Sequence, residues 1–161
     1  MGVTRKMRSP SPDNRRIKAK TCTVDGIEFA SETEGHFYCY LKRKKECGEI
    51  LEIECQPKFI LQPGCLRFGR KYQPIRYIAD FLVTYPDGHQ VVFDVKGYSM
   101  EDADLKRKIF AFQHPELELK WVAASKKYSE TGWIEYDDLK KCRTAARKAA
   151  KENKASPPLW R

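Results

Sequence analysis

The sequence lacks the features that mark secreted, membrane-spanning and zinc-binding proteins. Its N-terminus is basic and polar without an apolar signal core, and no hydrophobic run is long enough to span a membrane. None of the six cysteines forms a Cys-x-x-Cys pair, and no histidine stands at zinc-ligand spacing from them. We therefore expect reduced thiols in a cytoplasmic protein, with a structural thiol or zinc protein as the weaker alternative.

The middle of the chain lacks positive charge, although the chain as a whole is basic. The formal net charge is +9, yet residues 21–139 hold 16 basic and 20 acidic side chains. The surplus lies at the ends, with seven Lys or Arg in residues 1–20 and eight in residues 140–161. Basic ends on a mildly acidic body fit a polyanion such as nucleic acid, but two solvated tails would have the same composition. We divide the chain into a flexible basic arm (1–20), a folded core (21–136) and a basic C-terminal helix and tail (137–161).

Two strands and a tight turn dominate the middle of the sequence. The runs from Tyr77 to Tyr85 and from Gln90 to Val95 are rich in aromatic and β-branched side chains, which favour strands. Between them, Pro86-Asp87-Gly88 is typical of a three-residue hairpin loop, closed by Tyr85 and His89. The pattern therefore predicts an antiparallel hairpin whose register is set by the loop.

This register places charged residues on an apolar face. Counted back from the loop, Asp80 falls opposite Asp94, and Lys96 points to the same side as Asp94. By the same count this face also carries Ile78, Leu82 and Val92. Two carboxylates there require a cation, a proton or water, and a divalent metal would satisfy both. The alternative is a diagonal ion pair between Asp80 and Lys96, with Asp94 solvated.

A helix is predicted from Ser31 to about Cys47, with Gly48 ending it. Two interpretations of Glu34 compete. Ser31-x-x-Glu34 matches a capping box, in which the Glu side chain returns to the N–H of the cap. Alternatively, Glu34 points under the helix towards the two carboxylates. The residues by themselves favour the cap, because it needs no further assumption.

The remaining elements alternate between strands and helices. We expect a long strand at Ile50–Leu61 that is interrupted at Gln56-Pro57, because proline cannot donate to a ladder. The stretch Cys65–Ile75 is a small hairpin or a loop with basic residues. A helix at Met100–Gln113 would pack with Leu105, Ile109 and Phe112. Further expected elements are a short strand at 24–30, strands at 117–123 and 133–136, and a basic helix at 137–153. This order predicts an α/β domain on a mixed sheet.

The motif Asp80, thirteen further residues and Asp94-Val95-Lys96, preceded by a helix that carries Glu34, resembles the PD-(D/E)XK nuclease superfamily. More closely, the segments FASETEGHFYCYLK, ECQPKFILQPG, YIADFLVTYPDG and DVKGY are similar to a family of short phage and prophage proteins, presumed nucleases of unknown target. The resemblance implies a restriction-endonuclease-like αβββαβ core over residues 31–123, with a central mixed sheet flanked by helices. Ala79 departs from the proline that often precedes the first acidic residue.

The resemblance also implies the roles of individual residues. Asp80 and Asp94 match the acidic positions that bind Mg²⁺, for which Mn²⁺ usually substitutes, and the Val95 carbonyl is a third ligand. Lys96 matches the lysine that orients or activates the attacking water. Glu34 matches a helix carboxylate that supports a second metal or metal-bound water. The resemblance places Gln56 near the site as an accessory residue. The alternative is that Gln56 is only part of a bulge in the strand.

We therefore expect a Mg²⁺-dependent DNA endonuclease, acting in DNA recombination, repair or processing in the cytoplasm of the host cell if it is phage-encoded. Its partner would be DNA and not a membrane, and cutting at two-fold related sites would favour a homodimer. The alternative is a non-catalytic nucleic-acid-binding protein that uses its basic ends. Candidate phosphate contacts are Arg70, Lys71, Lys106, Arg107, Lys108, Lys140, Lys141, Arg143, Arg147 and Lys148.

Overall fold

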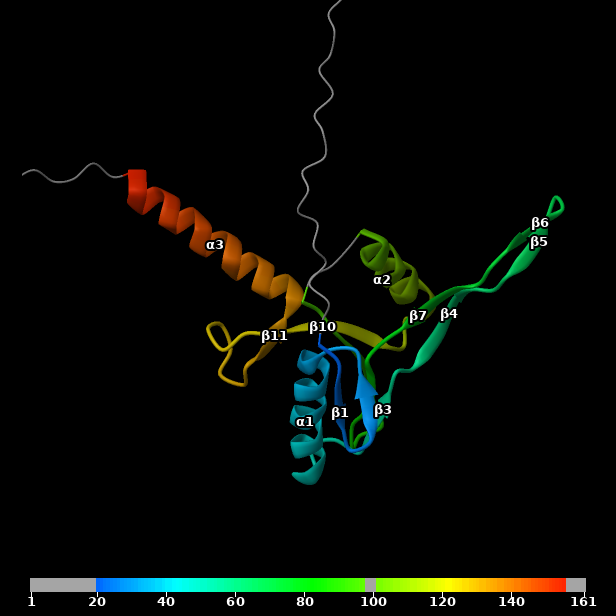
Figure 1. Ribbon diagram of the computed structural model, residues 1–161, viewed down its shortest axis with the longest axis horizontal. Coiled ribbons are helices and arrows are strands. Elements are labelled where there is room, and N and C mark those ends of the chain that lie inside the picture. Colours follow the sequence, from blue (N-terminus) through cyan, green and yellow to red (C-terminus); the bar gives the residue numbers. More distant parts are fainter. Residues whose placement is uncertain (1–19, 98–100, 156–161) are drawn as a thin grey trace, which may run out of the picture.

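The computed structural model describes residues 20–97 and 101–155 as an α/β domain. The flexible arm predicted at residues 1–20 therefore lies outside the described residues, apart from Lys20. A five-stranded mixed sheet and three helices make up most of the described chain (Figure 1). Within the described ranges, no helix is long and apolar enough to cross a membrane.

The central sheet has five strands in the order β11 (Trp133–Glu135), β10 (Glu118–Ala124), β9 (Gln90–Val95), β8 (Phe81–Thr84) and β3 (Glu52–Cys55). β8 pairs antiparallel with both β3 and β9, whereas β9 and β10 run parallel. A parallel pair requires a crossover connection, and helix α2 (Glu101–Gln113) lies in that connection. β11 returns antiparallel beside β10 at the edge of the sheet.

The loop between β8 and β9 has the predicted form. The N–H of Tyr85 donates to the His89 carbonyl, and the N–H of Gly88 donates to the Tyr85 carbonyl, both at 2.9 Å. Gly88 has a φ of 87°, a left-handed conformation that glycine adopts without steric cost. β8 consequently pairs with β9 in the predicted register, from Phe81 opposite Phe93 to the loop.

Helix α1 (Glu32–Glu46) covers one face of the sheet, together with a small hairpin of β1 (Cys22–Val24) and β2 (Ile27–Phe29) (Figure 1). The strand expected at 24–30 is instead the second half of this hairpin and begins at Ile27. A turn at Asp25-Gly26 joins the two short strands, and both residues have positive φ angles, of 53° and 78°. Such a pair of angles matches the twist of a two-residue hairpin turn.

The buried stripe of α1 forms an aromatic core with the sheet. Ser31 caps the helix and Gly48, with a φ of 77°, follows its C-terminal cap, as predicted. Phe37 and Leu41 are buried against residues of β8 and β9 that point to this face. The buried members of this core are Phe29, Phe37, Leu41, Ile50, Phe81, Val83, Val91, Phe93, Val95 and Val122.

Helix α2 packs on the opposite face of the sheet, where Phe110 is fully buried beside Val92. Val92 points away from α1 because successive strand residues alternate between the two faces. The predicted apolar face of α2 is wrong for two residues, since Leu105 is 59% and Phe112 is 87% exposed. The packed side instead includes Arg107, whose guanidinium lies over a buried ring of the sheet.

Helix α3 (Tyr136–Ala155) begins inside the domain and then leaves it. Tyr136 and Leu139 are buried against Trp121 of β10. From Arg143 to Glu152 every residue is exposed, and the helix extends from the body to the left of Figure 1. All six cysteines are free, in agreement with the expected reduced thiols.

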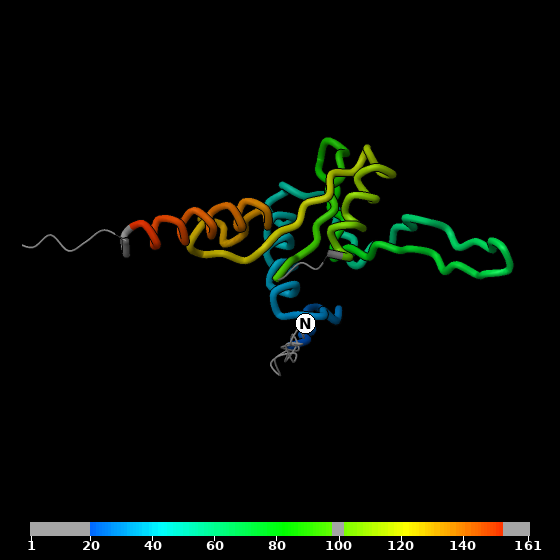
Figure 2. The backbone as a smooth tube through the Cα atoms, turned by 90° about the horizontal axis from the view of Figure 1, so that it is seen from above, coloured from blue at the N-terminus to red at the C-terminus, as the bar shows by residue number. Residues whose placement is uncertain are grey.

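The strands β3 and β8 continue beyond the sheet as a long hairpin. β4 (Lys58–Gln62) pairs antiparallel with β7 (Ile75–Ile78), and β5 (Cys65–Arg67) pairs with β6 (Arg70–Tyr72) at the end. Of the two alternatives expected for Cys65–Ile75, the structure has the hairpin. We call residues 58–78 the hairpin arm and residues 65–72 its tip. Figures 1 and 2 show that the arm extends away from the body on the side opposite to α3.

Candidate functional site

A break in the ribbon separates the hairpin arm from the sheet. Gln56 and Pro57 interrupt one strand, as predicted, and Gln56 has a φ of 55°. Ala79 and Asp80 interrupt the facing strand, so the unbroken strand predicted from residue 77 to residue 85 is wrong. The N–H of Gln56 donates to the Asp80 carbonyl at 2.8 Å, and that of Ala79 to the Pro57 carbonyl at 3.2 Å. Irregularities of this kind in paired strands bend a ribbon and re-aim side chains, often next to a functional site.

The break changes which side chains face the predicted site. Ile78 is 55% exposed instead of sharing a face with Asp80, whereas Tyr77 is 4% exposed, because the irregular backbone at Ala79-Asp80 interrupts the regular alternation of the strand. Asp80 also does not lie directly opposite Asp94. Its N–H donates at 3.1 Å to the carbonyl of Phe93, the residue that already pairs with β8.

Asp80 and Asp94 nevertheless meet at the end of β9. Oδ2 of Asp80 accepts the N–H of Val95 at 2.6 Å. Asp94 is 5% exposed, its Oδ2 accepts the hydroxyl of Tyr77, and its Oδ1 lies 2.7 Å from Nζ of Lys96. The diagonal ion pair with a solvated Asp94 is therefore wrong, since Lys96 pairs with Asp94, and Asp94 is buried. We call Asp80, Asp94 and Lys96 the carboxylate site.

Trp121 forms one wall of the carboxylate site. The parallel register of β9 and β10 places it beside Asp94. Its indole N–H donates to the Tyr77 hydroxyl at 2.9 Å, so that Tyr77 links the indole to the carboxylate. Nζ of Lys96 lies 5.1 Å from the ring centroid, and the guanidinium of Arg107 lies 4.6 Å from it. Both cations are thus held on an aromatic face within cation–π range.

The protonation of Asp80 depends on its burial and on the charges around it. Burial, and then the charge of Asp94, raise the pKa of Asp80 to about 7, while the Val95 N–H acts in the opposite direction. Glu34 contributes to the rise and Lys96 opposes it. Burial and the neighbouring Asp94 also raise the pKa of Tyr77, which therefore stays a neutral hydrogen-bond donor at neutral pH.

Glu34 lies near the carboxylate site but its side chain is engaged at the start of α1. Its Oε1 accepts the Ser31 hydroxyl at 2.8 Å, and its Oε2 accepts the N–H of Ala30 at 3.0 Å. The N–H of Glu34 in turn donates to Oγ of Ser31 at 3.2 Å. This is a variant of the capping box, in which Glu34 accepts the backbone N–H of the residue before the cap instead of the backbone N–H of the cap.

A pocket of about 470 Å³ opens beside Asp94 and Lys96. Arg76 from the hairpin arm and Lys106 from α2 line it, so cations from three segments surround the buried acid. The full lining is Arg76, Tyr77, Ile78, Asp94, Lys96, Asp102, Ala103 and Lys106. Within residues 20–97 and 101–155, no group of three or more His, Cys, Asp or Glu side chains is arranged around one point, so the carboxylate site supplies a pair of acids.

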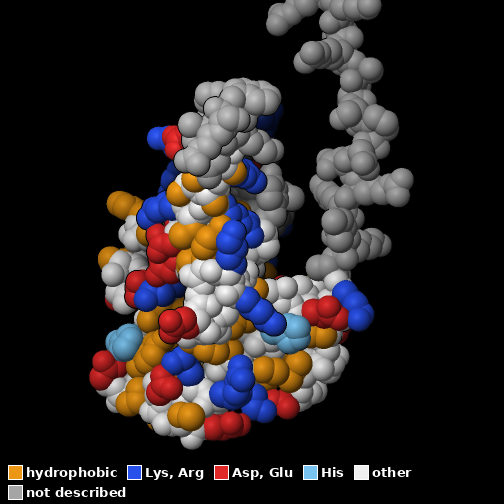
Figure 3. Space-filling model, turned by 90° about the vertical axis from the view of Figure 1, so that its left-hand side faces the viewer, with side chains coloured by type: hydrophobic (Ala, Val, Ile, Leu, Met, Phe, Trp, Pro, Cys, Tyr) orange, Lys and Arg blue, Asp and Glu red, His pale blue; other side chains and the backbone are white. Residues whose placement is uncertain are grey.

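Some of the predicted DNA contacts form ion pairs within the protein, and others are exposed without such a pair among the described residues. Arg107 is bound to Asp137 at 2.6 Å, and Lys108 to Asp104 at 2.9 Å. Lys140 and Lys141 are exposed but pair within the first turns of α3, at 3.3 and 2.8 Å. The remaining exposed candidates are Arg70, Lys71, Arg143, Arg147 and Lys148. Figure 3, seen from the α3 side, shows Lys and Arg side chains on this face with acidic and hydrophobic ones between them.

Gln56 occupies the break next to Asp80 and is exposed. Its side-chain amide donates to the Glu28 carbonyl at 3.5 Å, and its backbone has the left-handed conformation already described. The structure therefore gives Gln56 the position of a bulge residue, within backbone contact of Asp80.

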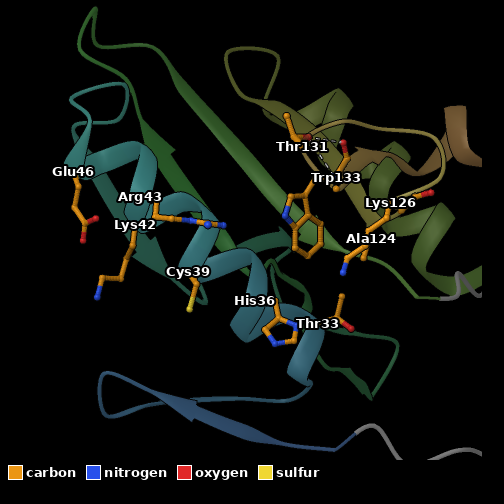
Figure 4. A pocket seen from close by; sticks show the side chains of 12 residues that line it. Thr33, His36, Cys39, Lys42, Arg43, Glu46, Ala124, Lys126, Thr131 and Trp133 are labelled. Carbon is orange, nitrogen blue, oxygen red and sulfur yellow. Dashed lines mark hydrogen bonds between the residues drawn. The ribbon is translucent and has the colours of Figure 1, made fainter.

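A larger hollow of about 730 Å³ lies elsewhere, between α1 and the segment that joins β10 to β11 (Figure 4). His36, Arg43 and Lys126 contribute nitrogen atoms to its lining, and Glu46 is its one acidic residue. Because it brings no two carboxylates together, it does not offer the chemistry of the carboxylate site, despite its greater volume.

Sequence reasoning missed Tyr77 and Trp121 as site residues. Both were assigned to strands, but only the break at Ala79-Asp80 turns the Tyr77 hydroxyl towards Asp94. Trp121 is at least 25 positions away in the sequence from Tyr77, Asp80, Asp94 and Lys96, and it meets them through strand pairing. A signal was present in the polar tips of both rings, which usually find a hydrogen-bond partner when buried.

Comparison with known proteins identifies the family of the chain. The model of the family described as "Protein of unknown function (DUF1064)" matches residues 14–130, and the protein belongs to this family. No curated protein and no solved structure matches the chain. The match covers every described element from β1 to β10, including the hairpin arm and all three residues of the carboxylate site, and leaves out β11 and α3.

Proposed function

We propose that this protein is a Mg²⁺-dependent DNA endonuclease that hydrolyses phosphodiester bonds. The observation that carries the proposal is the meeting of Asp80, Asp94 and Lys96 at one end of β9, beside a pocket lined by Arg76 and Lys106. Carboxylates that hold a divalent cation, next to a lysine and further cations for phosphate, are the groups that phosphodiester hydrolysis requires.

The donor set of the carboxylate site fits Mg²⁺. This ion is typically held by one or two carboxylates together with substrate phosphate oxygens. Asp80 and Asp94 would hold it, with the Val95 carbonyl as a further ligand. Burial beside Asp94 disfavours the ionised form of Asp80, and a bound cation would offset that cost. When bound, the cation would supply charge neutralisation at the phosphate and lower the pKa of a bound water.

The residues of the chain would divide the remaining work. Lys96, held over Trp121 and beside Asp94, would orient the attacking water or stabilise the developing negative charge. Tyr77 fixes the Asp94 carboxylate through its hydroxyl, and Trp121 fixes Tyr77 in turn. Arg76 and Lys106 would contact phosphate oxygens at the mouth of the pocket. Such fixed groups need little rearrangement during the reaction, which is the basis of electrostatic catalysis.

The order of elements supports a restriction-endonuclease-like core. When the hairpin arm (β4 to β7) is left aside, the chain runs α1, β3, β8, β9, α2 and β10, which is an αβββαβ succession with the carboxylate site on its central hairpin. Under this proposal, the exposed part of α3 is a basic helix that contacts the DNA backbone, together with exposed cations of the hairpin arm.

Nicking of supercoiled plasmid tests the proposal. The wild type should nick in Mg²⁺ or Mn²⁺ and not in EDTA. Asp80→Asn and Asp94→Asn should lower the rate at least about a thousandfold, or about 4 kcal/mol of transition-state stabilisation. Asp87→Asn is the matched control, because it makes the same change in the exposed loop of the same hairpin and should cut like the wild type. Wild-type rates in both site variants would refute the assignment.

One observation favours a second function, that of a non-catalytic nucleic-acid-binding protein. Both oxygens of Asp94 already have partners, Tyr77 and Lys96, so the acid also satisfies the requirements of a structural residue in a buried network. A wild-type protein that binds DNA but cuts no plasmid, forked, four-way or single-stranded DNA in either metal would support this alternative.

A further inference from the structure

The tip of the hairpin arm exposes hydrophobic side chains that a folded domain normally buries. Leu66 is 69% exposed, Tyr72 48%, and Phe68, at the turn, 103%. None of them belongs to a hydrophobic cluster of the described residues, and the arm extends away from the body (Figure 2). Large apolar groups clustered on a projecting surface indicate contact with a partner.

Phe68 is also held in an unfavourable backbone conformation. It has a φ of 49° and Gly69 a φ of 74°, as a two-residue hairpin turn requires. Glycine and asparagine fit the first of these positions well, whereas an aromatic residue there is strained. Nothing in the described chain packs on the ring to compensate for this strain. A large ring held at such a position therefore points to a role in binding.

The arm carries charge of one sign. Residues 56–79 contain five basic residues and no acidic one. At the tip, Arg67 lies directly opposite Arg70, a like-charge pair that destabilises the ribbon unless an anion lies between or beside the two side chains. None of the five cations forms an ion pair with a side chain in the described part of the chain. This charge is complementary to a partner with repeated negative charges.

A two-stranded ribbon of this kind fits the grooves of duplex DNA. Phenylalanine is one of the residues that DNA-binding proteins insert between base steps, and aromatic rings also stack on unpaired bases. We infer that the tip of the hairpin arm binds DNA through Arg67, Arg70 and Lys71, while Phe68 stacks on a base that is unpaired or easily unstacked. The inference rests on the proposed function for its DNA partner, and it narrows the substrate to DNA with such a step.

Binding in EDTA tests the arm without any contribution from cleavage. Fluorescence anisotropy would compare a fully paired duplex with the same duplex carrying one unpaired 2-aminopurine at its centre. Phe68→Ala should bind the second DNA at least about fivefold more weakly, and the first within twofold, because one stacked base is lost. Phe68→Trp should retain binding. Phe112→Ala is the matched control, since it removes another exposed phenylalanine, on α2, and should change neither affinity.

Two further readouts separate stacking from charge. Wild type should quench the 2-aminopurine fluorescence and Phe68→Ala should not. The triple variant R67Q/R70Q/K71Q should weaken binding to both DNAs and reduce the slope of log Kd against log salt by about two to three. Equal binding and equal quenching by wild type and Phe68→Ala would overturn the inference. So would a sedimentation shift from dimer to monomer in the arm variants with DNA binding unchanged, which would make the arm a contact between copies.

The outcomes also separate this inference from the proposed function. If the arm variants behave as expected but the wild type cuts no DNA, the nuclease assignment fails and the arm inference stands. If Asp80→Asn abolishes cleavage while Phe68→Ala binds and quenches like the wild type, the arm inference fails alone.

Discussion

One β-ribbon passes through two opposite environments in this protein. On the body side of the break at Ala79-Asp80, the side chains of Phe81 and Val83 in β8 are fully buried in the core beneath α1. Beyond the break, the same two strands carry exposed residues such as Leu66 and Phe68 to the tip of the hairpin arm. The body side thus contributes the free energy of folding, whereas the tip contributes little to it and presents its side chains outward.

The polar side chains of the carboxylate site have partners within the protein, whereas those at the tip of the hairpin arm do not have such partners among the described residues. At the carboxylate site, Asp94 is held by a tyrosine hydroxyl and a lysine, and the tyrosine by an indole N–H. At the tip, two arginines face each other without a carboxylate near them in the sequence. A complete buried network positions groups for chemistry, while unneutralised surface charge attracts a partner. The comparison predicts that variants of the two regions affect different measured quantities.

The largest expected effect is a loss of cleavage rate without a loss of affinity for DNA. Lys96→Gln should lower cleavage at saturating DNA by about a hundredfold to a thousandfold, as the loss of one stabilising group does, while the Kd for DNA stays within about threefold. The arm variant R67Q/R70Q/K71Q should instead raise the Kd. Lys45→Gln, at an exposed position of α1, is the control. A Lys96→Gln protein that fails only in affinity would remove the distinction between the regions.

Truncation of one phenylalanine on each side of the break should affect stability strongly on the body side and hardly at all at the tip. Phe81→Ala empties a fully buried position and should lower the free energy of unfolding by about 3–5 kcal/mol. Phe68→Ala should change it by less than about 0.5 kcal/mol, since exposed substitutions rarely do more. Urea unfolding measures both. Similar losses in the two variants would mean that the tip folds back onto the body.

A matched pair of tyrosines tests the buried network. Tyr77→Phe leaves the Trp121 N–H without its acceptor and removes a donor from Asp94, so it should cost about 1–3 kcal/mol of stability. Tyr72→Phe removes the same hydroxyl from the arm, where the side chain is 48% exposed, and should cost less than about 0.5 kcal/mol. Thermal or urea unfolding of the pair gives the difference directly, and a neutral Tyr77→Phe would contradict the assigned network.

The pH dependence of stability should report on Asp80. Its pKa in the folded state is about 7, above the ordinary value of 3.8, so the folded protein holds more protons between these pH values. Without divalent cations, the free energy of unfolding should therefore fall as pH rises from about 4 to about 7. Asp80→Asn should remove at least about 1 kcal/mol of that fall. Glu130→Gln, which removes an exposed carboxylate outside the lining of the pocket, should preserve it. A profile that is the same in wild type and Asp80→Asn would contradict the buried, acid-paired environment.

The smallest effect on folding is expected in α3. The variant R143Q/R147Q/K148Q changes three exposed side chains beyond the packed first turns, and should alter stability by less than about 0.5 kcal/mol. If this helix contacts DNA, the salt slope of binding should fall by one or more units, which would group α3 with the hairpin arm. An unchanged slope would show that the arm acts without α3.

Local chemistry explains what could be predicted from the sequence. Pro86-Asp87-Gly88 determines a three-residue loop, and the loop determines the register of β8 and β9 up to Phe81. Ser31 and Gly48 mark the ends of α1 because capping depends on residues within one turn. Pro57 marks the interruption of its own strand, since it has no N–H. These local rules predict that Asp80, Asp94 and Lys96 lie at the same end of the hairpin, although the predicted position of Asp80 directly opposite Asp94 is wrong.

Only the tertiary structure decided the surroundings of those residues. The interruption at Ala79-Asp80 depends on the facing Gln56-Pro57, which lies more than twenty residues away, so alternation within the strand gave the wrong face for Tyr77 and Ile78. Trp121 reaches Asp94 only through the parallel pairing of β9 and β10. These contacts join segments that are distant in the chain, and their geometry depends on how the whole sheet packs. Sequence determined the residues that can carry the chemistry, and packing decided which of them touch.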